Sequence, residues 1–331
     1  DRDGVGDLAI GVRSASAGGA KRGTVRIVSG KRRRLLSARI DGPEDYGFTG
    51  AALCSLPDQN ADGWPELVVA SPGESQARGI VRVHSGADLK VSITLRGRGA
   101  EDAFGTSLDR AGDMDGDGRV DLVVGSPNEA PHNPEHGTTR VFDARTGRVL
   151  RSVVGDVRFG RLGTRVCGLG DVTGDGRAEF AAAAPTRELA GAPDVGRVHV
   201  YDGETGATLY TLDGDGAGAF FGRSLAGGRD VDGDGWPDLV VGSPYSTSSR
   251  IKGRRGRLRG AVTVYSGPTG EPIQRVEGLS EGALGGWAVA VLGTGDDASA
   301  IAVGAPGRQE TAPAPDDPDP RAGMLLLFEV D

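Results

Sequence analysis

The stretch Asp113-Met-Asp-Gly-Asp-Gly-Arg-Val-Asp-Leu-Val-Val-Gly-Ser-Pro127 joins an acidic loop directly to a short apolar strand. Its acids occupy positions 1, 3, 5 and 9 of the loop, and they repel one another unless a cation lies among them. Carboxylates that bend round a glycine form a cage of hard oxygens, which Ca²⁺ prefers, and Arg119 at position 7 would add its backbone carbonyl. The Leu-Val-Val-Gly-Ser that follows predicts a buried strand that ends at Pro127.

The same loop and strand recur along the chain. Three further full copies run over residues 58–72, 171–185 and 230–244. The chain opens inside another copy, because Asp1, Asp3 and Asp7 fit positions 3, 5 and 9. A last copy at 294–306 keeps the strand but has a shorter loop with little beyond Asp296. The six strands start 59, 55, 58, 59 and 62 residues apart, and such a steady long period is typical of repeat architectures.

Each period contains four strand patterns. Strand A precedes the acidic loop, as in Phe104–Leu108 and Phe221–Leu225, and strand B follows the loop. Strand C alternates between polar and apolar residues, as in 196–203, and strand D follows a tight glycine turn, as in 205–214. Alternation with period two between glycine turns produces antiparallel hairpins, and no segment shows a sustained helical period. Four antiparallel strands per unit predict the blades of a β-propeller.

We therefore predict an all-β propeller with six visible blades in one domain that spans residues 1–331. The approximate units are 1–46, 47–100, 101–158, 159–216, 217–280 and 281–331. The first unit lacks strand A and the last lacks strand D. Because the first loop is also truncated, we expect an N-terminally clipped chain whose parent has six or seven blades.

The charge of the chain is concentrated in the acidic loops. The net charge is -8, and the five loops hold 17 acidic side chains, so the chain without them would carry about +9. The acidity is therefore local and ligand-like. No apolar run approaches the roughly 18 residues that cross a bilayer, so we expect no membrane insertion by this chain. Cys54 and Cys167 stand at equivalent positions two repeats apart, which favours two small buried residues over a disulfide or a metal pair.

A recurring dipeptide and a recurring tripeptide give the repeats a family resemblance. Phe104-Gly105 and Phe221-Gly222, together with Gly125-Ser-Pro127, Gly242-Ser-Pro244 and Gly304-Ala-Pro306, resemble the FG-GAP repeats of the integrin α-subunit propeller. The Phe-Gly half is degraded in three repeats. The resemblance covers nearly the whole chain and implies a seven-bladed propeller, Ca²⁺ in the A–B hairpins, and ligand recognition on the opposite face. The sequence lacks Arg-Gly-Asp, and nothing in it indicates a partner integrin subunit.

The resemblance, carried over by position, implies four full calcium sites and one truncated site. The full sets are Asp58, Asn60, Asp62, Trp64 and Glu66; Asp113, Asp115, Asp117, Arg119 and Asp121; Asp171, Thr173, Asp175, Arg177 and Glu179; and Asp230, Asp232, Asp234, Trp236 and Asp238. The truncated set is Asp1, Asp3, Val5 and Asp7. Thr173 is a weaker ligand than aspartate, and Glu66 and Glu179 are longer, so we expect these sites to bind less tightly than the two all-aspartate loops.

A second charged region is predicted on the face away from the acidic loops, because A–B and C–D loops share one face of a blade and B–C and D–A loops share the other. The fifth B–C loop is basic, with Arg250, Lys252, Arg254, Arg255, Arg257 and Arg259. The sixth is acidic, with Glu310, Asp316, Asp317 and Asp319. Two interpretations stay open: a recognition patch for an acidic glycan or protein, or a solvated insertion whose charges pair with its neighbour. Nucleic acid is disfavoured, because no aromatic residue in the basic loop could stack on bases.

Three smaller features have structural interpretations that we favour. His132 and His136 lie in a loop with Pro131 and Pro134, which argue against a helical metal site. The run 31–34 (Lys-Arg-Arg-Arg) falls on a C–D hairpin and predicts a charged rim. Trp64 and Trp236 are expected to pack against a blade edge, with a sugar-stacking platform as the alternative.

No catalytic motif accompanies these features. The sequence contains no Gly-x-Ser-x-Gly elbow, no phosphate loop and no zinc-spaced histidine cluster. We therefore predict an extracellular or cell-surface, calcium-binding recognition and adhesion module that is not an enzyme. The alternatives are the propeller domain of a secreted hydrolase or polysaccharide lyase, and a purely structural repeat of a large surface protein. The oligomeric state stays open.

Overall fold

The computed structural model describes residues 3–129, 135–246, 259–278, 283–294, 297–306, 324–328 and 330. The strands in this part of the chain are β1 (Leu8–Val12), β2 (Thr24–Ser29), β3 (Arg34–Asp41), β4 (Leu53–Leu56), β5 (Glu66–Ser71), β6 (Ile80–His84), β7 (Val91–Arg96), β8 (Ser107–Gly112), β9 (Asp121–Ser126), β10 (Thr138–Phe142), β11 (Val149–Val154), β12 (Arg165–Gly170), β13 (Glu179–Ala184), β14 (Arg197–Tyr201), β15 (Thr208–Asp213), β16 (Ser224–Arg229), β17 (Asp238–Ser243), β18 (Ala261–Tyr265), β19 (Pro272–Glu277), β20 (Ala288–Thr294), β21 (Asp297–Ala305) and β22 (Met324–Phe328). A single helical turn, α1 (Glu74–Ala77), lies between β5 and β6.

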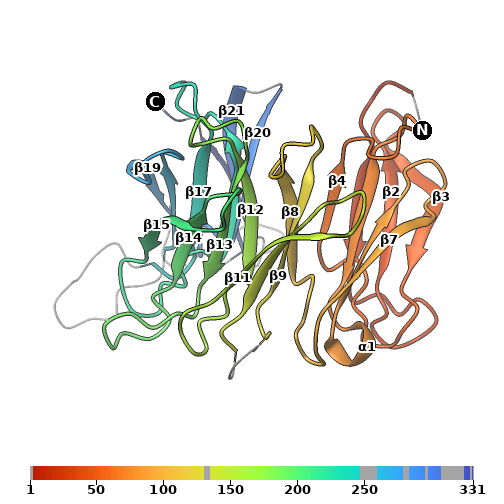
Figure 1. Cartoon of the computed structure of the whole chain (residues 1–331), viewed down its shortest axis with the longest axis horizontal. Coiled ribbons are helices and arrows are strands. Elements are labelled where there is room, and N and C mark those ends of the chain that lie inside the picture. The colour runs from red at the N-terminus through yellow and green to blue at the C-terminus, as the bar shows by residue number, and fades with distance from the viewer. Residues whose placement is uncertain are drawn as a thin grey trace, which may run out of the picture.

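These strands form six antiparallel sheets, which are the blades of a β-propeller (Figure 1). Blade 1 is β1–β3, blades 2 to 5 are β4–β7, β8–β11, β12–β15 and β16–β19, and blade 6 is β20–β22. In the described residues, blade 1 lacks the innermost strand and blade 6 lacks the outermost one. The predicted all-β propeller and its strand pattern are confirmed.

The second strand of each complete blade forms its core. β9, β13 and β17 are buried along their whole length, because other strands cover both edges and neighbouring blades cover both faces. The outermost strand is more exposed, and in β15 only Tyr210 and Leu212 are half-buried or buried. The innermost strands of neighbouring blades pack closely side by side around the propeller axis, and a Cβ on Gly168 of β12 would lie 2.0 Å from the carbonyl oxygen of Arg110 in β8.

The Phe-Gly dipeptides lie outside the strands, which corrects the predicted position of strand A. We expected strands at Phe104–Leu108 and Phe221–Leu225, but β8 and β16 begin at Ser107 and Ser224. Phe104 lies in the connection that follows β7. Its amide donates, at 3.2 Å, to the carbonyl of Arg78, which lies just before β6. Gly105 has φ +84°, and a Cβ there would lie 2.8 Å from Val81 of blade 2. The dipeptide therefore couples one blade to the preceding blade, and its glycine is required by both φ and space.

The loop geometry agrees with the predicted division into two faces. Ser85, in the C–D turn of blade 2, donates to Asp62 of the A–B loop at 3.0 Å, and Arg148 of the next blade pairs with Asp115 at 2.9 Å. Residues from B–C and D–A connections line one shared cavity at the other end of the blades. No helix in the described part of the chain is long and apolar enough to cross a membrane.

Candidate metal loops and the opposite face

The first acid of each full loop folds the loop around itself. Asp113 accepts the amides of Gly116 at 2.7 Å and Gly118 at 2.8 Å, one on each carboxylate oxygen. Asp171 and Asp230 make the same pair of bonds to the amides four and six positions into their loops. Asp58 differs slightly, because its first oxygen accepts from Asn60 and Asp62 instead. The loop is therefore shaped by hydrogen bonds that the chain supplies itself.

The fifth position closes the turn in the same way in every full loop. The amide at position 7 donates to the carboxylate at position 5 at 2.8–2.9 Å, in the pairs Trp64–Asp62, Arg119–Asp117, Arg177–Asp175 and Trp236–Asp234. In the truncated loop, Val5 makes this bond to Asp3 at 3.1 Å, while Asp7 accepts the amide of Gly30. Asp1 lies outside the described residues.

The acid at position 9 is the most informative residue of each loop. It is buried in all four full copies, and one oxygen accepts the amide at position 2 at 2.8–2.9 Å. Among the residues that the structure describes, the other oxygen is buried and makes no hydrogen bond in Glu66, Glu179 and Asp238, although the backbone amides of Gly203 and Gly267 act on Glu179 and Asp238 and lower their pKa values. A buried carboxylate oxygen without a partner is costly, and a bound cation is the simplest compensation. This set of oxygens fits a hard divalent cation such as Ca²⁺.

The electrostatics of these acids favour a bound cation. Burial, together with the negative charges of the neighbouring Asp115 and Asp113, raises the pKa of Asp121 to about 7. Burial and the other loop acids likewise raise the pKa of Glu179 to about 7 and that of Asp238 to about 6. The ionised forms of these carboxylates are therefore disfavoured unless a cation binds among them.

Three loops bring carboxylates close enough together to share an ion. The groups are Asp113, Asp115 and Asp121; Asp175, Glu179 and Asp202; and Asp230, Asp232 and Asp234, with candidate ligand atoms within 4.8 Å of one another in each. Asp202 was not predicted. It lies in the C–D turn, as the residue after strand C, where its counterpart Ser85 also reaches the acidic loop of its own blade. This shared contact of the C–D turn is the pattern that could have revealed it.

Position 7 side chains connect the loops of successive blades. Arg119 donates to the carbonyl of Gln59 at 2.7 Å, and Arg177 donates to the carbonyl of Met114 at 3.2 Å. The Trp236 ring lies over Gly174, where an added Cβ would be 3.1 Å from the ring. Each side chain reaches back to the loop of the preceding blade. The predicted packing role of Trp236 is thus seen as a loop-to-loop contact, and sugar stacking stays a prediction.

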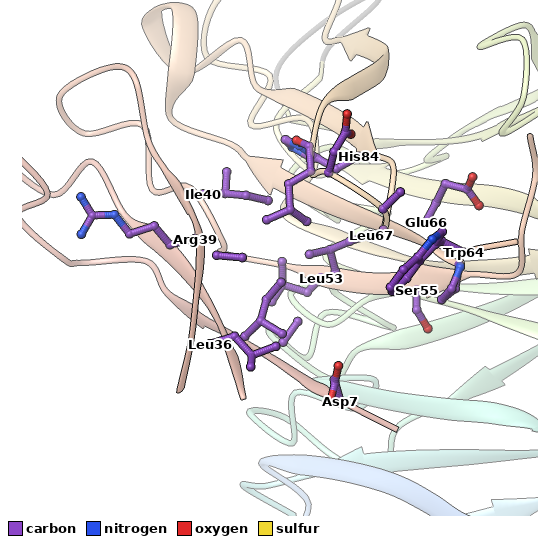
Figure 2. A pocket seen from close by; sticks show the side chains of 18 of the residues that line it. Asp7, Leu36, Arg39, Ile40, Leu53, Ser55, Trp64, Glu66, Leu67 and His84 are labelled. Atoms are coloured by element: carbon purple, nitrogen blue, oxygen red, sulfur yellow. The ribbon is translucent and has the colours of Figure 1, made fainter. Parts of the chain in front are cut away.

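A cleft of about 970 Å³ lies between blades 1 and 2 beside the loop that contains Trp64. Figure 2 shows Leu36, Ile40, Leu53 and Leu67 gathered in its centre, with Trp64 and Glu66 at one side. His84 pairs with Leu67 as Phe142 pairs with Leu122 in blade 3. Phe142 packs against Phe104 with ring centroids 5.8 Å apart, whereas Thr49 occupies the Phe104 position in blade 2. Of these two blade 2 residues, His84 lines the cleft.

Several predicted features lie mostly outside the described residues, and others have structural roles within them. Of the basic loop 250–259 only Arg259 is described, and the acidic loop residues 310–319 also lie outside. His132 is likewise outside, and the two acids of that loop are used in ion pairs: Glu129 with Arg140 at 2.7 Å and Glu135 with Arg161 at 2.6 Å. Cys54 and Cys167 are free thiols, and Cys167 is buried.

Residues 104–149, 162–201 and 221–265 match the FG-GAP repeat family. The chain is 30% identical to integrin alpha-5 of Xenopus laevis over 198 residues, which cover 55% of this chain and 18% of that protein. The chain is an integrin-alpha-like FG-GAP propeller. The three matched segments fall on blades 3, 4 and 5, which also carry the three carboxylate groups.

Other integrin α subunits show the same level of similarity to this FG-GAP propeller. Integrin alpha-V of Gallus gallus is 29% identical over 214 residues, covering 60% of this chain and 20% of that protein. Integrin alpha-IIb of Homo sapiens is 31% identical over 193 residues, covering 54% and 18%. The chain thus spans about a fifth of the length of these relatives. Among solved structures, the WD40 domain of Neurospora crassa Pan2 aligns with 90% of this chain and 71% of that chain, at a TM-score of 0.48 and 13% identity.

Proposed function

We propose that this FG-GAP propeller is a calcium-stabilised recognition and adhesion module that acts outside the cell or at its surface. The observation that carries the calcium role is the position 9 acid: buried, bonded to its own loop through one oxygen, and left with a second buried oxygen that lacks a partner in three blades. The similarity to integrin α subunits supports the recognition role. A protein or acidic glycan is the proposed partner, on the face opposite the loops.

In this proposal the ions are structural. The carboxylates at positions 1, 3, 5 and 9, with the carbonyl at position 7, would hold the cation. Its positive charge would neutralise the negative charge of the buried acids. The chain's own residues do the rest: the position 1 acid folds the loop, and the position 7 side chain attaches it to the preceding blade. The proposal assigns no catalytic step to the propeller.

A dissociation constant of the size expected for such calcium sites favours an exterior location. At a dissociation constant near 10⁻⁴ M and about 1 mM Ca²⁺, each site adds roughly 1.4 kcal/mol to the free energy of unfolding. Sites of this affinity would stay almost empty at cytosolic calcium concentrations. An extracellular module would keep them filled.

The calcium role is tested by isothermal titration of metal-free protein with Ca²⁺, and with Mg²⁺ as the control. We expect Ca²⁺ binding at submillimolar concentration and little response to Mg²⁺, because the loops offer many oxygens in a flexible cage whereas Mg²⁺ demands a strict octahedron. Absence of Ca²⁺ binding at millimolar concentration would overturn the proposal.

A further inference from the structure

The face opposite the acidic loops contains a central cavity of about 670 Å³. Its wall is built by residues from blades 1 to 5, from the B–C and D–A connections and the starts of the innermost strands. We call it the funnel. Five of its lining residues are cations: Arg13, Lys21, Arg161, Arg165 and Arg223. Within the described part of the chain its lining contains no aspartate or glutamate.

Two of the five cations have partners elsewhere. Arg161 forms an ion pair with Glu135 at 2.6 Å, and Lys21 lies 6.0 Å from the centre of the Tyr46 ring. The other three are Arg13, Arg165 and Arg223, and no ion pair joins any of them to an acid among the residues that the structure describes. Their positive charges are therefore not neutralised by a neighbouring side chain.

The groups that do contact these arginines cannot cancel charge. Arg165 donates to the carbonyl of Thr164 at 2.7 Å, and the guanidinium of Arg223 lies 4.7 Å from the centre of the Trp287 ring. Burial and, to a smaller extent, the charges of Arg223 and Arg13 together lower the pKa of Arg165 to about 10. Burial also lowers the pKa of Arg223, and Arg13 again contributes. Arg165 and Arg223 thus hold their charges in a partly desolvated site, and the exposed Arg13 lies close enough to repel both.

The rest of the wall mixes apolar residues with neutral polar ones, which are Ser14, Thr106, Asn128, Thr164 and Thr186. Phe48, Phe220 and the prolines Pro72, Pro127 and Pro185 surround the arginines. Beside them the Phe220 ring lies 5.3 Å from Tyr245, and Tyr245 lies 6.1 Å from Trp287. Guanidinium forks bind carboxylates in bidentate fashion, and an apolar surround strengthens such a bond by excluding water. The cavity therefore combines an anion-binding centre with a rim for apolar side chains.

The arginines occupy positions that the other blades fill differently. Arg13 follows strand β1, where all five other repeats have proline. Arg223 follows the Phe-Gly dipeptide, where blades 3 and 4 have threonine, and Arg165 stands one position later, where blades 3 and 5 have serine. Three separate departures from the repeat converge on one cavity, although no position in the repeat needs arginine for folding.

We propose that the funnel binds a carboxylate side chain of a protein partner, presented between apolar residues. A peptide segment fits because its single acid can reach the arginines while its apolar neighbours contact the phenylalanine and proline rim. A sulfated polysaccharide is charged along its whole length and fits an open basic track better than a depression with an apolar rim. This inference rests on the recognition role proposed above and is independent of the calcium role.

The test is selection of a displayed library of random nonapeptides against the calcium-loaded chain. We expect enriched peptides to contain aspartate or glutamate beside apolar residues. Their affinity should fall at least tenfold in the variant R13Q/R223Q and when the peptide acid is changed to the corresponding amide. The matched control is Arg96→Gln on β7, an exposed arginine outside the funnel, which should bind the peptides as the unaltered chain does.

Three results would overturn the proposal: a library that yields no peptide, enrichment of peptides without acids, or affinity that R13Q/R223Q leaves unchanged. If dextran sulfate displaced the displayed peptides but the same peptides added in free form did not, the funnel would be assigned to a polysaccharide instead. Melting temperature and Ca²⁺ titration of each variant separate these outcomes from misfolding and from failure of the calcium role, because a correctly folded variant melts no lower than the unaltered chain and binds Ca²⁺ as that chain does.

Discussion

The two faces of the propeller concentrate opposite charges in different ways. On one face the same acidic loop is built four times, and each copy is shaped by its own backbone amides. On the other face Arg13, Arg165 and Arg223 come from three blades, and each replaces a different residue type in the repeat. On the function proposed above, a feature repeated in four blades serves the stability of each of those blades. A feature that exists only when blades are assembled serves the whole ring, and recognition is a function of that kind.

This comparison predicts that removing calcium has the largest effect on stability. Four independent sites with dissociation constants near 10⁻⁴ M would add roughly 5–6 kcal/mol at about 1 mM Ca²⁺, comparable with the whole stability of an ordinary domain. We expect a large fall of the melting temperature in excess EGTA, with full recovery on adding Ca²⁺ and little recovery with Mg²⁺. Scanning calorimetry across a Ca²⁺ titration measures it, and an unchanged melting temperature in EGTA contradicts it.

The next largest effect is expected from removing the calcium site of a single acidic loop. Asp121→Ala removes the position 9 acid of blade 3 and should abolish one site's share of the calcium-dependent stability, roughly 1.4 kcal/mol. The measurement is the difference between urea unfolding free energies with Ca²⁺ and with EGTA. Asp88→Asn is the control, because Asp88 is an exposed acid paired with Lys90 and lies outside the loops. A calcium increment equal to that of the unaltered chain would show that Asp121 holds no ion.

The sequence predicted the features that repeat and missed those that do not. Period and alternation were enough for the blades, because each strand's burial is determined within its own unit. The acidic loops were found because the acids are adjacent in sequence. Asp202 and the funnel arginines were missed because each is a single residue whose neighbours come from other strands or blades. The prediction that the Phe-Gly dipeptide lies inside a strand is wrong because Phe104 bonds to Arg78 of the preceding blade, a contact that the pattern within one repeat does not reveal.

The connection between acidic loops predicts a smaller effect. Arg119→Met keeps an unbranched apolar stem but loses the hydrogen bond to the carbonyl of Gln59 in the preceding blade, so we expect a loss of about 1 kcal/mol. Arg145→Met, at an exposed position in the C–D turn, is the control for loss of charge. Urea unfolding of both variants in Ca²⁺ gives the difference. Equal stabilities would mean that the bond between the loops contributes nothing measurable.

The smallest expected effect has the opposite sign and is the sharpest test of the difference between the faces. An acid taken from a loop removes a proposed stabilising site, whereas Arg165→Met removes a partly desolvated cation whose hydrogen-bond partner, among the described residues, is the carbonyl of Thr164 and which has two like charges nearby. Methionine fills similar apolar space, so the melting temperature should stay unchanged or rise. The corresponding gain in the free energy of unfolding should be about 1 kcal/mol or less. The expected gain is larger at low salt, where repulsion among the three arginines is least screened. A clear loss of stability at every salt concentration would mean that Arg165 supports the fold. The funnel would then be a structural feature like the loops, and the contrast between a stabilising face and a recognition face would fail at that residue.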